Sequence, residues 1–161
     1  MSFPPPRILT LPPTHLVGMR RKMSMAQNET RQLWQGFMPR RKKITHRVDQ
    51  KYLSLQVFPA GVDFASATIT TVFEKWAAVA VSNIWDIPEG MEVLNLEPAE
   101  YAIFLHKGTP QTFPQTREYI LRSWLPTSGY EIDDRPQFEV LEEGYNPMDP
   151  EAEEEIWIPI K

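Results

Sequence analysis

The stretch ILTLPPTHLVGMRRKMS, residues 8–24, occurs twice in this chain in related form. It aligns without a gap on VLNLEPAEYAIFLHKGT, residues 93–109. Pro13 aligns with Pro98, and the leucines two and four residues before each proline align as well. In each copy, apolar residues alternate as in a short β-strand, which turns at the proline into a second strand. The match predicts that the chain is an internal repeat.

A helix is predicted after each copy. Residues 28–39 and 115–125 each carry apolar side chains at positions i, i+1, i+4 and i+5. This spacing places the apolar side chains on one stripe of a helix, which can pack against a sheet. The helices are expected to end at the prolines that follow, Pro39 and Pro126, because proline interrupts a helix.

Two further strands close each copy. YLSLQVF (52–58) resembles PQFEVLE (136–142), and TVFEKWAAVAV (71–81) resembles EEEIWIPI (153–160). Each half therefore has the order β-β-α-β-β. We predict an α+β fold, in which the two halves are related by a pseudo-twofold axis. Its antiparallel sheet has two helices on one face, and a ligand cleft lies between the halves.

The length of 161 residues and the hydrophobic fraction of 42% suit one domain with a core of its own. The prediction treats residues 1–161 as this domain. Its halves are about 7–81 and 91–161, and residues 82–90 connect them.

The composition excludes several classes of protein. The chain has no cysteine, which excludes disulfides and thiolate metal sites and indicates a reducing compartment. No stretch has the pattern of a signal peptide or of a membrane span, so we expect a cytoplasmic protein. The histidines His15, His46 and His106 lack metal-ligand spacing, and no phosphate or dinucleotide fingerprint occurs. We therefore expect neither a metal nor a cofactor.

The charge is distributed unevenly along the chain. Residues 1–60 hold eleven Lys/Arg and two acidic residues, a net charge of +9, whereas residues 61–161 carry −13. Most of this charge suits a solvated surface, and a basic face for a polyanion is the alternative.

Glu155 lies where a run of glutamates meets the apolar end of the chain. Because side chains alternate along a strand, Ile156, Ile158 and Ile160 are expected to share one face and to pack under the helices. Glu155 then shares the other face with Trp157, as Glu74 does with Trp76 in the first half. Alternation leaves two possibilities open, a solvent-exposed face or a cleft between the halves.

Four elements in order resemble the GyrI-like domain, the effector-binding domain of AraC-type and multidrug-sensing regulators. They are the turn Pro88-Glu89-Gly90-Met91, the strand from Tyr101 to Gly108, the segment from Trp124 to Tyr130, and the terminal E-x-W-I-P-I pattern from Glu155 to Ile160. The resemblance covers residues 7–161. Only about six residues precede the first strand, too few for a helix-turn-helix, so the resemblance is to a stand-alone member.

The resemblance implies a pocket between the halves, lined by aromatic side chains, for lipophilic cationic or planar small molecules. It places Glu155, four residues before Pro159, at the base of this pocket. Candidates for the wall are Trp157, Trp76, Tyr101, Tyr52, Phe64 and Trp85, and Trp34 and Trp124 are assigned to the core. No direct contact with nucleic acid and no membrane contact are expected, and the oligomeric state stays open.

Two alternative functions accompany the resemblance. In the first, the pocket hydrolyses cyclopropanoid DNA-alkylating compounds, with Glu155 and Glu74 as acid and base about 5–9 Å apart. In the second, the domain binds a protein partner such as gyrase or a regulator through the basic residues 20–22 and 40–47.

Overall fold

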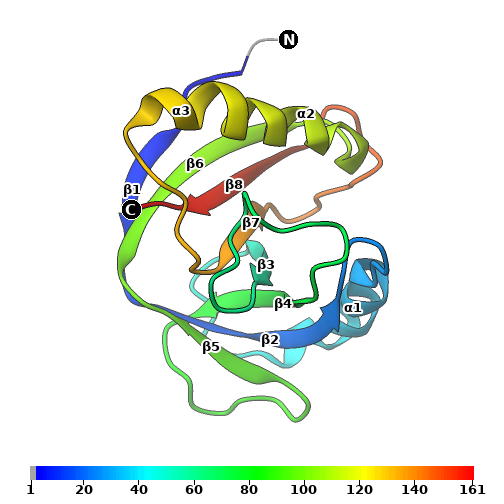
Figure 1. Cartoon of the computed structure of the whole chain (residues 1–161). Coiled ribbons are helices and arrows are strands. Elements are labelled where there is room, and N and C mark those ends of the chain that lie inside the picture. Colours follow the sequence, from blue (N-terminus) through cyan, green and yellow to red (C-terminus); the bar gives the residue numbers. More distant parts are fainter. Residues whose placement is uncertain (1–2) are drawn as a thin grey trace.

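The computed structural model describes residues 3–161. Eight strands form one antiparallel sheet in the order β1-β6-β8-β7-β3-β4-β2-β5, and helical segments pack on it (Figure 1). The strands are β1 Arg7–Leu11, β2 Thr14–Met23, β3 Tyr52–Val57, β4 Phe73–Val81, β5 Glu92–Leu96, β6 Ala99–Lys107, β7 Gln137–Leu141 and β8 Glu153–Pro159. The predicted α+β fold with two repeated halves is confirmed.

The first strands of the two halves are exchanged. β1 pairs with β6 of the second half, and β5 pairs with β2 of the first half. Arg7 lies opposite Ile103, and Gly18 lies opposite Glu92, so both ladders keep the same register. Residues 7–18 and 92–103 therefore form a single antiparallel ladder that is interrupted only at the links Pro12-Pro13 and Glu97-Pro98.

These two-residue links determine the shape of the sheet. β1 is first and β2 is seventh in the strand order, which would separate them by about 29 Å in a flat sheet. Three peptide units, from Leu11 to Thr14, span at most about 11 Å. The sheet must therefore curl until its two ends meet at the links, where Figure 1 shows the β1-β2 and β5-β6 segments bending together at the lower left.

The curl gives the sheet an inner face and an outer, helix-covered face. Apolar side chains from all eight strands form one cluster on the inner face, with Leu16, Leu55, Trp76, Tyr101 and Phe138 among its buried members. The outer face instead carries two separate clusters, one in each half. Ile156, Ile158 and Ile160 are at most 2% exposed in the second of these, which confirms their predicted burial.

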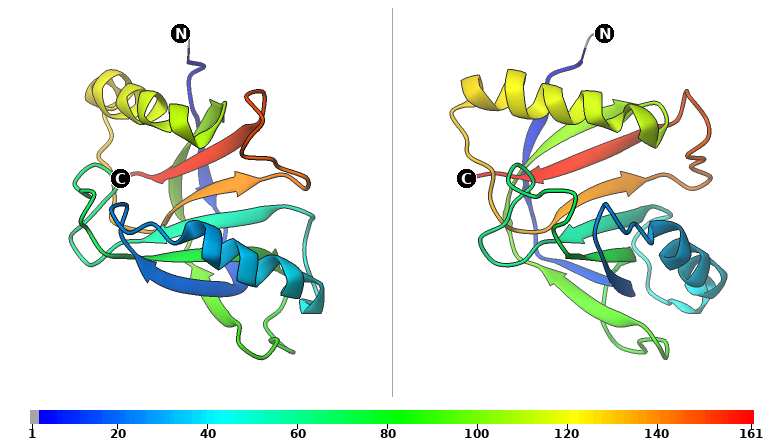
Figure 2. Two further views of the ribbon diagram at one scale, coloured as in Figure 1. Left: turned by 90° about the vertical axis from the view of Figure 1, so that its right-hand side faces the viewer. Right: turned by 45° about the vertical axis from the view of Figure 1, so that its right-hand side comes forward.

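One helical segment covers the outer face of each half (Figure 2). α1 (Thr30–Phe37) continues as a 3₁₀ helix at Met38–Lys43. A 3₁₀ turn at Pro110–Thr112 leads into α2 (Phe113–Glu118), a π-helical turn at Tyr119–Trp124, and α3 (Leu125–Ser128). Trp34 and Trp124 pack against the outer clusters, as predicted.

The prediction that the helices end at Pro39 and Pro126 is wrong. Each proline lies in the first turn of a new helical segment, where a residue without a backbone N–H is tolerated. The first segment becomes 3₁₀ just before Pro39, and the second contains a π-helical turn before Pro126.

Candidate functional site

Glu155 lies on the inner face, near one end of β8. Its neighbours across the ladders are Leu105 on β6 and Val140 on β7. Arg7 Nη2 donates to Glu155 Oε2 over 2.7 Å, and Trp157 Nε1 donates to Glu155 Oε1 over 3.2 Å. The side chain is 31% exposed. Glu155 is therefore a partly covered carboxylate at the rim of the aromatic face, and we call these five residues the Glu155 rim.

A cluster of three aromatic rings adjoins this rim. Phe138 and Trp157 stack with their centroids 5.1 Å apart, and Tyr101 lies 5.9 Å from Trp157 and 5.2 Å from Phe138. Tyr101 is buried, and its hydroxyl donates to Pro136 O over 2.8 Å. Burial raises the pKa of Tyr101 to about 12. Tyr101 is therefore a buried ring tilted against the stacked pair, and Trp157 is the half-buried ring beside Glu155.

The first half repeats the contacts of Glu155 around Glu74, with Trp76 in place of Trp157 and Arg20 in place of Arg7. Trp76 Nε1 donates to Glu74 Oε1 over 3.3 Å, and Arg20 Nη1 donates to Glu74 Oε2 over 2.7 Å. Arg20 also bonds Glu92 over 2.7 Å, so two carboxylates share it. Trp76 is only 4% exposed, whereas Trp157 is half-buried. The rim at Glu74 is thus a copy of the Glu155 rim in which one arginine is shared by two carboxylates.

The sheet register holds Glu74 and Glu155 far apart. A row of opposed residues on the inner face runs from Trp157 through Phe138 and Leu55 to Trp76. Glu155 lies on one side of this row and Glu74 on the other, three strands apart and four residues out of line. The offset of four residues alone separates their Cα atoms by about 13 Å along the strand direction, which curling across the strands does not shorten. This register does not form the close carboxylate pair of the hydrolysis hypothesis.

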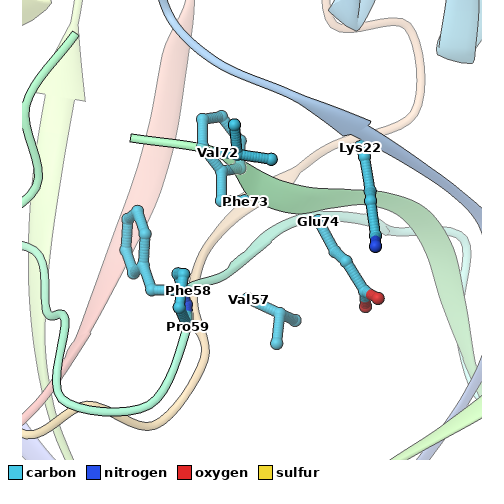
Figure 3. A pocket seen from close by; sticks show the side chains of 7 residues that line it. All are labelled: Lys22, Val57, Phe58, Pro59, Val72, Phe73 and Glu74. Atoms are coloured by element: carbon cyan, nitrogen blue, oxygen red, sulfur yellow. The ribbon is translucent and has the colours of Figure 1, made fainter. Parts of the chain in front are cut away.

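A groove lies beside Glu74 (Figure 3). Its volume is about 360 Å³, and it is lined by Lys22, Val57, Phe58, Pro59, Val72, Phe73 and Glu74. A second hollow of about 340 Å³ adjoins it and is lined by Arg20, Arg21, Lys22 and Glu74. Sequence reasoning missed this groove because residues 58 and 59 and residue 72 lie outside the strands and carry no periodic pattern.

Three residues proposed from the sequence for the pocket wall lie elsewhere. Tyr52 is buried on the outer face, where it packs with Trp34 beneath α1. Phe64 is buried in the outer cluster of the second half. Trp85 is 75% exposed in the segment between β4 and β5. The structure therefore brings Glu155, Trp157 and Tyr101 together, and leaves Tyr52, Phe64 and Trp85 away from them.

Several basic residues of the protein-partner hypothesis have partners within the chain. Arg21 pairs with Glu29, and Arg20 with two carboxylates. Arg40 donates to the carbonyl of Glu89, and Arg41 to that of Met38. The carboxylates paired with Arg20 and Arg21 offset charge that an external partner would use, whereas the carbonyl contacts of Arg40 and Arg41 leave their charge in place.

A buried polar cluster on the outer face was not foreseen from the sequence. Lys75 donates to Gln56, which donates to Gln137 and to Glu139, and Glu154 lies near Lys75 and Glu139. Burial lowers the pKa of Lys75, against the influence of the two carboxylates. Burial, assisted by Glu139, raises the pKa of Glu154 to about 8. The signal in the sequence was Lys75, a charged residue at an outward position of an apolar strand.

This cluster predicts a pH dependence of stability. Because the pKa of Glu154 is higher in the folded than in the unfolded chain, the folded state binds more protons between about pH 4.5 and 8. The free energy of unfolding should therefore fall as pH rises through this window. The groups facing Glu154 are Lys75, Glu139, Tyr145 and, opposite on β6, His106.

We expect the wild type to be less stable at pH 8 than at pH 6 by about 1–3 kcal/mol in urea unfolding, since one pKa unit corresponds to about 1.4 kcal/mol. The Glu154→Gln variant should lose this difference. A wild-type slope that survives in Glu154→Gln would assign the effect to another group.

The domain thus combines a curled antiparallel sheet with an aromatic inner face and carboxylates at its rims. The chain belongs to the family of the GyrI-like small molecule binding domain, whose model matches residues 4–161. No helix within residues 3–161 is long and apolar enough to span a membrane, and in the same range no three His, Asp or Glu side chains are placed to hold a metal.

The chain is similar to the transcriptional regulator BrlR of Pseudomonas aeruginosa, with 27% identity over 155 residues. The match covers 96% of this chain and 54% of BrlR, so the chain spans about half the length of this curated relative. Among solved structures, SAV2435 bound to tetraphenylphosphonium is similar over 100% of this chain and 94% of its own, with a TM-score of 0.68 and 20% identity. The EcmrR C-terminal domain has a TM-score of 0.72 and 12% identity, over 100% and 99% of the two chains.

Proposed function

We propose that this domain binds lipophilic organic cations at the Glu155 rim. The observation that carries the proposal is the contact between the Glu155 carboxylate and the Trp157 indole N–H, flanked by Leu105 and Val140. The carboxylate supplies a countercharge, and the indole and aliphatic side chains supply an apolar contact surface. An aromatic cation needs both, and a purely polar ligand needs only the first.

Arg7 is the internal counter-ion that such a ligand replaces. It lies at the first residue of the edge strand β1, and its side chain is 59% exposed. Exposed ion pairs contribute about 0–1 kcal/mol, so breaking this pair costs little. A bound aromatic cation gains about 25 cal/mol for each Å² of apolar surface removed from water. A cation over the Trp157 ring gains roughly a further 0.5–2 kcal/mol.

Tetraphenylphosphonium, the compound bound to SAV2435, supports this class of ligand for the present chain. It is a delocalised cation with an apolar surface and no hydrogen-bond donor. A site that offers one carboxylate and an aromatic face matches that chemistry.

The test is a titration with tetraphenylphosphonium, followed by quenching of tryptophan fluorescence. We expect saturable binding, and binding of the neutral analogue triphenylphosphine oxide that is at least tenfold weaker. Equal affinity for the two compounds would show that charge is not recognised, and no binding of either would contradict the proposal.

Removing the internal counter-ion should strengthen binding. In the Arg7→Gln variant, the cation no longer competes with a guanidinium for Glu155, so we expect the Kd for tetraphenylphosphonium to fall about threefold to fivefold. Arg122→Gln is the matched control, because Arg122 is 80% exposed on the helical segment of the outer face. Weaker binding in Arg7→Gln, with Arg122→Gln unchanged, would mean that Arg7 does not compete with the ligand.

A further inference from the structure

The groove beside Glu74 combines an apolar wall with a free cation. Phe58 and Phe73 lie with their ring centroids 5.7 Å apart, and Val57, Pro59 and Val72 extend this wall. Lys22 lies at the other end of the groove (Figure 3). Within residues 3–161, Lys22 forms no ion pair.

The Glu74 carboxylate in this groove already has hydrogen-bond partners within the chain. Both oxygens of Glu74 accept hydrogen bonds, one from Arg20 and one from Trp76. Arg20 cannot swing away as easily as Arg7, because Glu92 holds its Nε. Lys22 lies opposite Glu74 across the β2–β4 ladder and forms no ion pair with it, so its ammonium is the cation at this groove that can pair with a ligand.

The two rims differ at residues that correspond to each other in the internal alignment. In the internal alignment, Glu92 corresponds to Arg7 and Arg20 corresponds to Leu105. At the Glu155 rim, the edge strand β1 supplies the cation Arg7, and the neighbouring strand β6 supplies the apolar side chain of Leu105. At Glu74, the edge strand supplies an acid that anchors Arg20, and Lys22 follows two residues later on the same face of β2.

We propose that the groove beside Glu74 is a second ligand site, which binds a lipophilic monoanion such as an aryl sulfonate or aryl carboxylate. The aromatic body lies on Phe58, Phe73 and Val72, and the anionic group pairs with Lys22. The volume of about 360 Å³ suits a ligand of two or three rings. This site goes beyond the proposed cation site and does not depend on it.

The probe is 8-anilinonaphthalene-1-sulfonate, whose fluorescence rises in an apolar site. We expect one saturable site per chain, with Lys22→Gln raising the Kd at least fivefold and the charge-matched surface control Lys42→Gln leaving it unchanged. N-phenyl-1-naphthylamine has the same rings without the sulfonate, and its affinity should be equal in wild type and Lys22→Gln. Val72→Asp should abolish binding of both probes, and because Val72 is 56% exposed the fold should tolerate this change.

Competition separates this site from the cation site. Tetraphenylphosphonium should not displace the sulfonate probe, and Glu155→Gln should not weaken it. An unchanged Kd in Lys22→Gln, or loss of probe binding in Glu155→Gln, would overturn the proposal. Neither result would decide the proposed cation site, because the tetraphenylphosphonium titration tests the Glu155 rim separately.

Discussion

Replacing Gly18 by valine is expected to destabilise the domain by at least about 3 kcal/mol. Gly18 lies on the inner face of β2, opposite Ala78 of β4 and Glu92 of β5. A Cβ atom there would overlap the carbonyl oxygen of Ala77 and lie 2.7 Å from Ala78 Cα. Both are backbone atoms that cannot turn aside, so the two strands must separate. Overpacking a core ordinarily costs about 1–3 kcal/mol, and a backbone clash lies at or above the upper end.

Urea unfolding followed by tryptophan fluorescence measures this loss. Gly36→Ala is the matched control, because Gly36 is in α1 and an added Cβ would meet only Met19 Cε at 3.8 Å. Alanine is favoured over glycine in a helix, so this control should be stabilised by up to about 1 kcal/mol. A Gly18→Val protein as stable as the wild type would contradict the close packing of β2 on β4.

The largest functional effect is expected from Glu155→Gln. Glutamine keeps the size of the side chain and an oxygen that can accept the Trp157 hydrogen bond, so this variant removes only the charge. The Kd for tetraphenylphosphonium should rise at least tenfold, which corresponds to about 1.4 kcal/mol. The affinity for triphenylphosphine oxide should not change. Glu118→Gln, a charge-matched change on α2, should leave both values at the wild-type level.

Glu155→Gln also leaves Arg7 without its partner, which by itself would repel a cation. The double variant Arg7→Gln/Glu155→Gln separates the two effects in a double-mutant cycle. If the loss of affinity disappears in the double variant, repulsion by Arg7 is the cause and the carboxylate does not bind the ligand. If at least a fivefold loss remains, the carboxylate recognises the cation.

The repeat in the sequence was enough to predict the α+β class and the two β-β-α-β-β halves. Matching Pro13 with Pro98 located four of the strands, and alternation placed the isoleucines of β8 beneath the helical segment. The exchange of β1 and β5 was not foreseen, although Pro12-Pro13 carries the signal for it. Two-residue hairpin turns need positive φ at one or both central residues, which proline cannot adopt, so β1 cannot fold back on β2.

The candidate site was predicted less completely than the fold. Alternation along β8 and β4 put each glutamate on the same face as the tryptophan two residues later. Alternation does not apply to Phe64 and Trp85, which lie outside strands. It also does not tell which face of β3 Tyr52 lies on as a wall residue. Residues 52–55 are all buried, so both faces of β3 face a core. The distance between Glu74 and Glu155 depends on the order of strands in the sheet, which the repeat does not specify.

The most direct test of the proposed cation site is to locate the bound cation. Tetraphenylarsonium has the shape and charge of tetraphenylphosphonium, and its arsenic atom gives an anomalous signal in crystals soaked with it. We expect one arsenic peak on the inner face, within about 6 Å of the Trp157 ring, with Arg7 turned away from Glu155. An arsenic peak in the groove beside Glu74 or on the helix-covered face, with the Arg7–Glu155 pair intact, would contradict the proposed site.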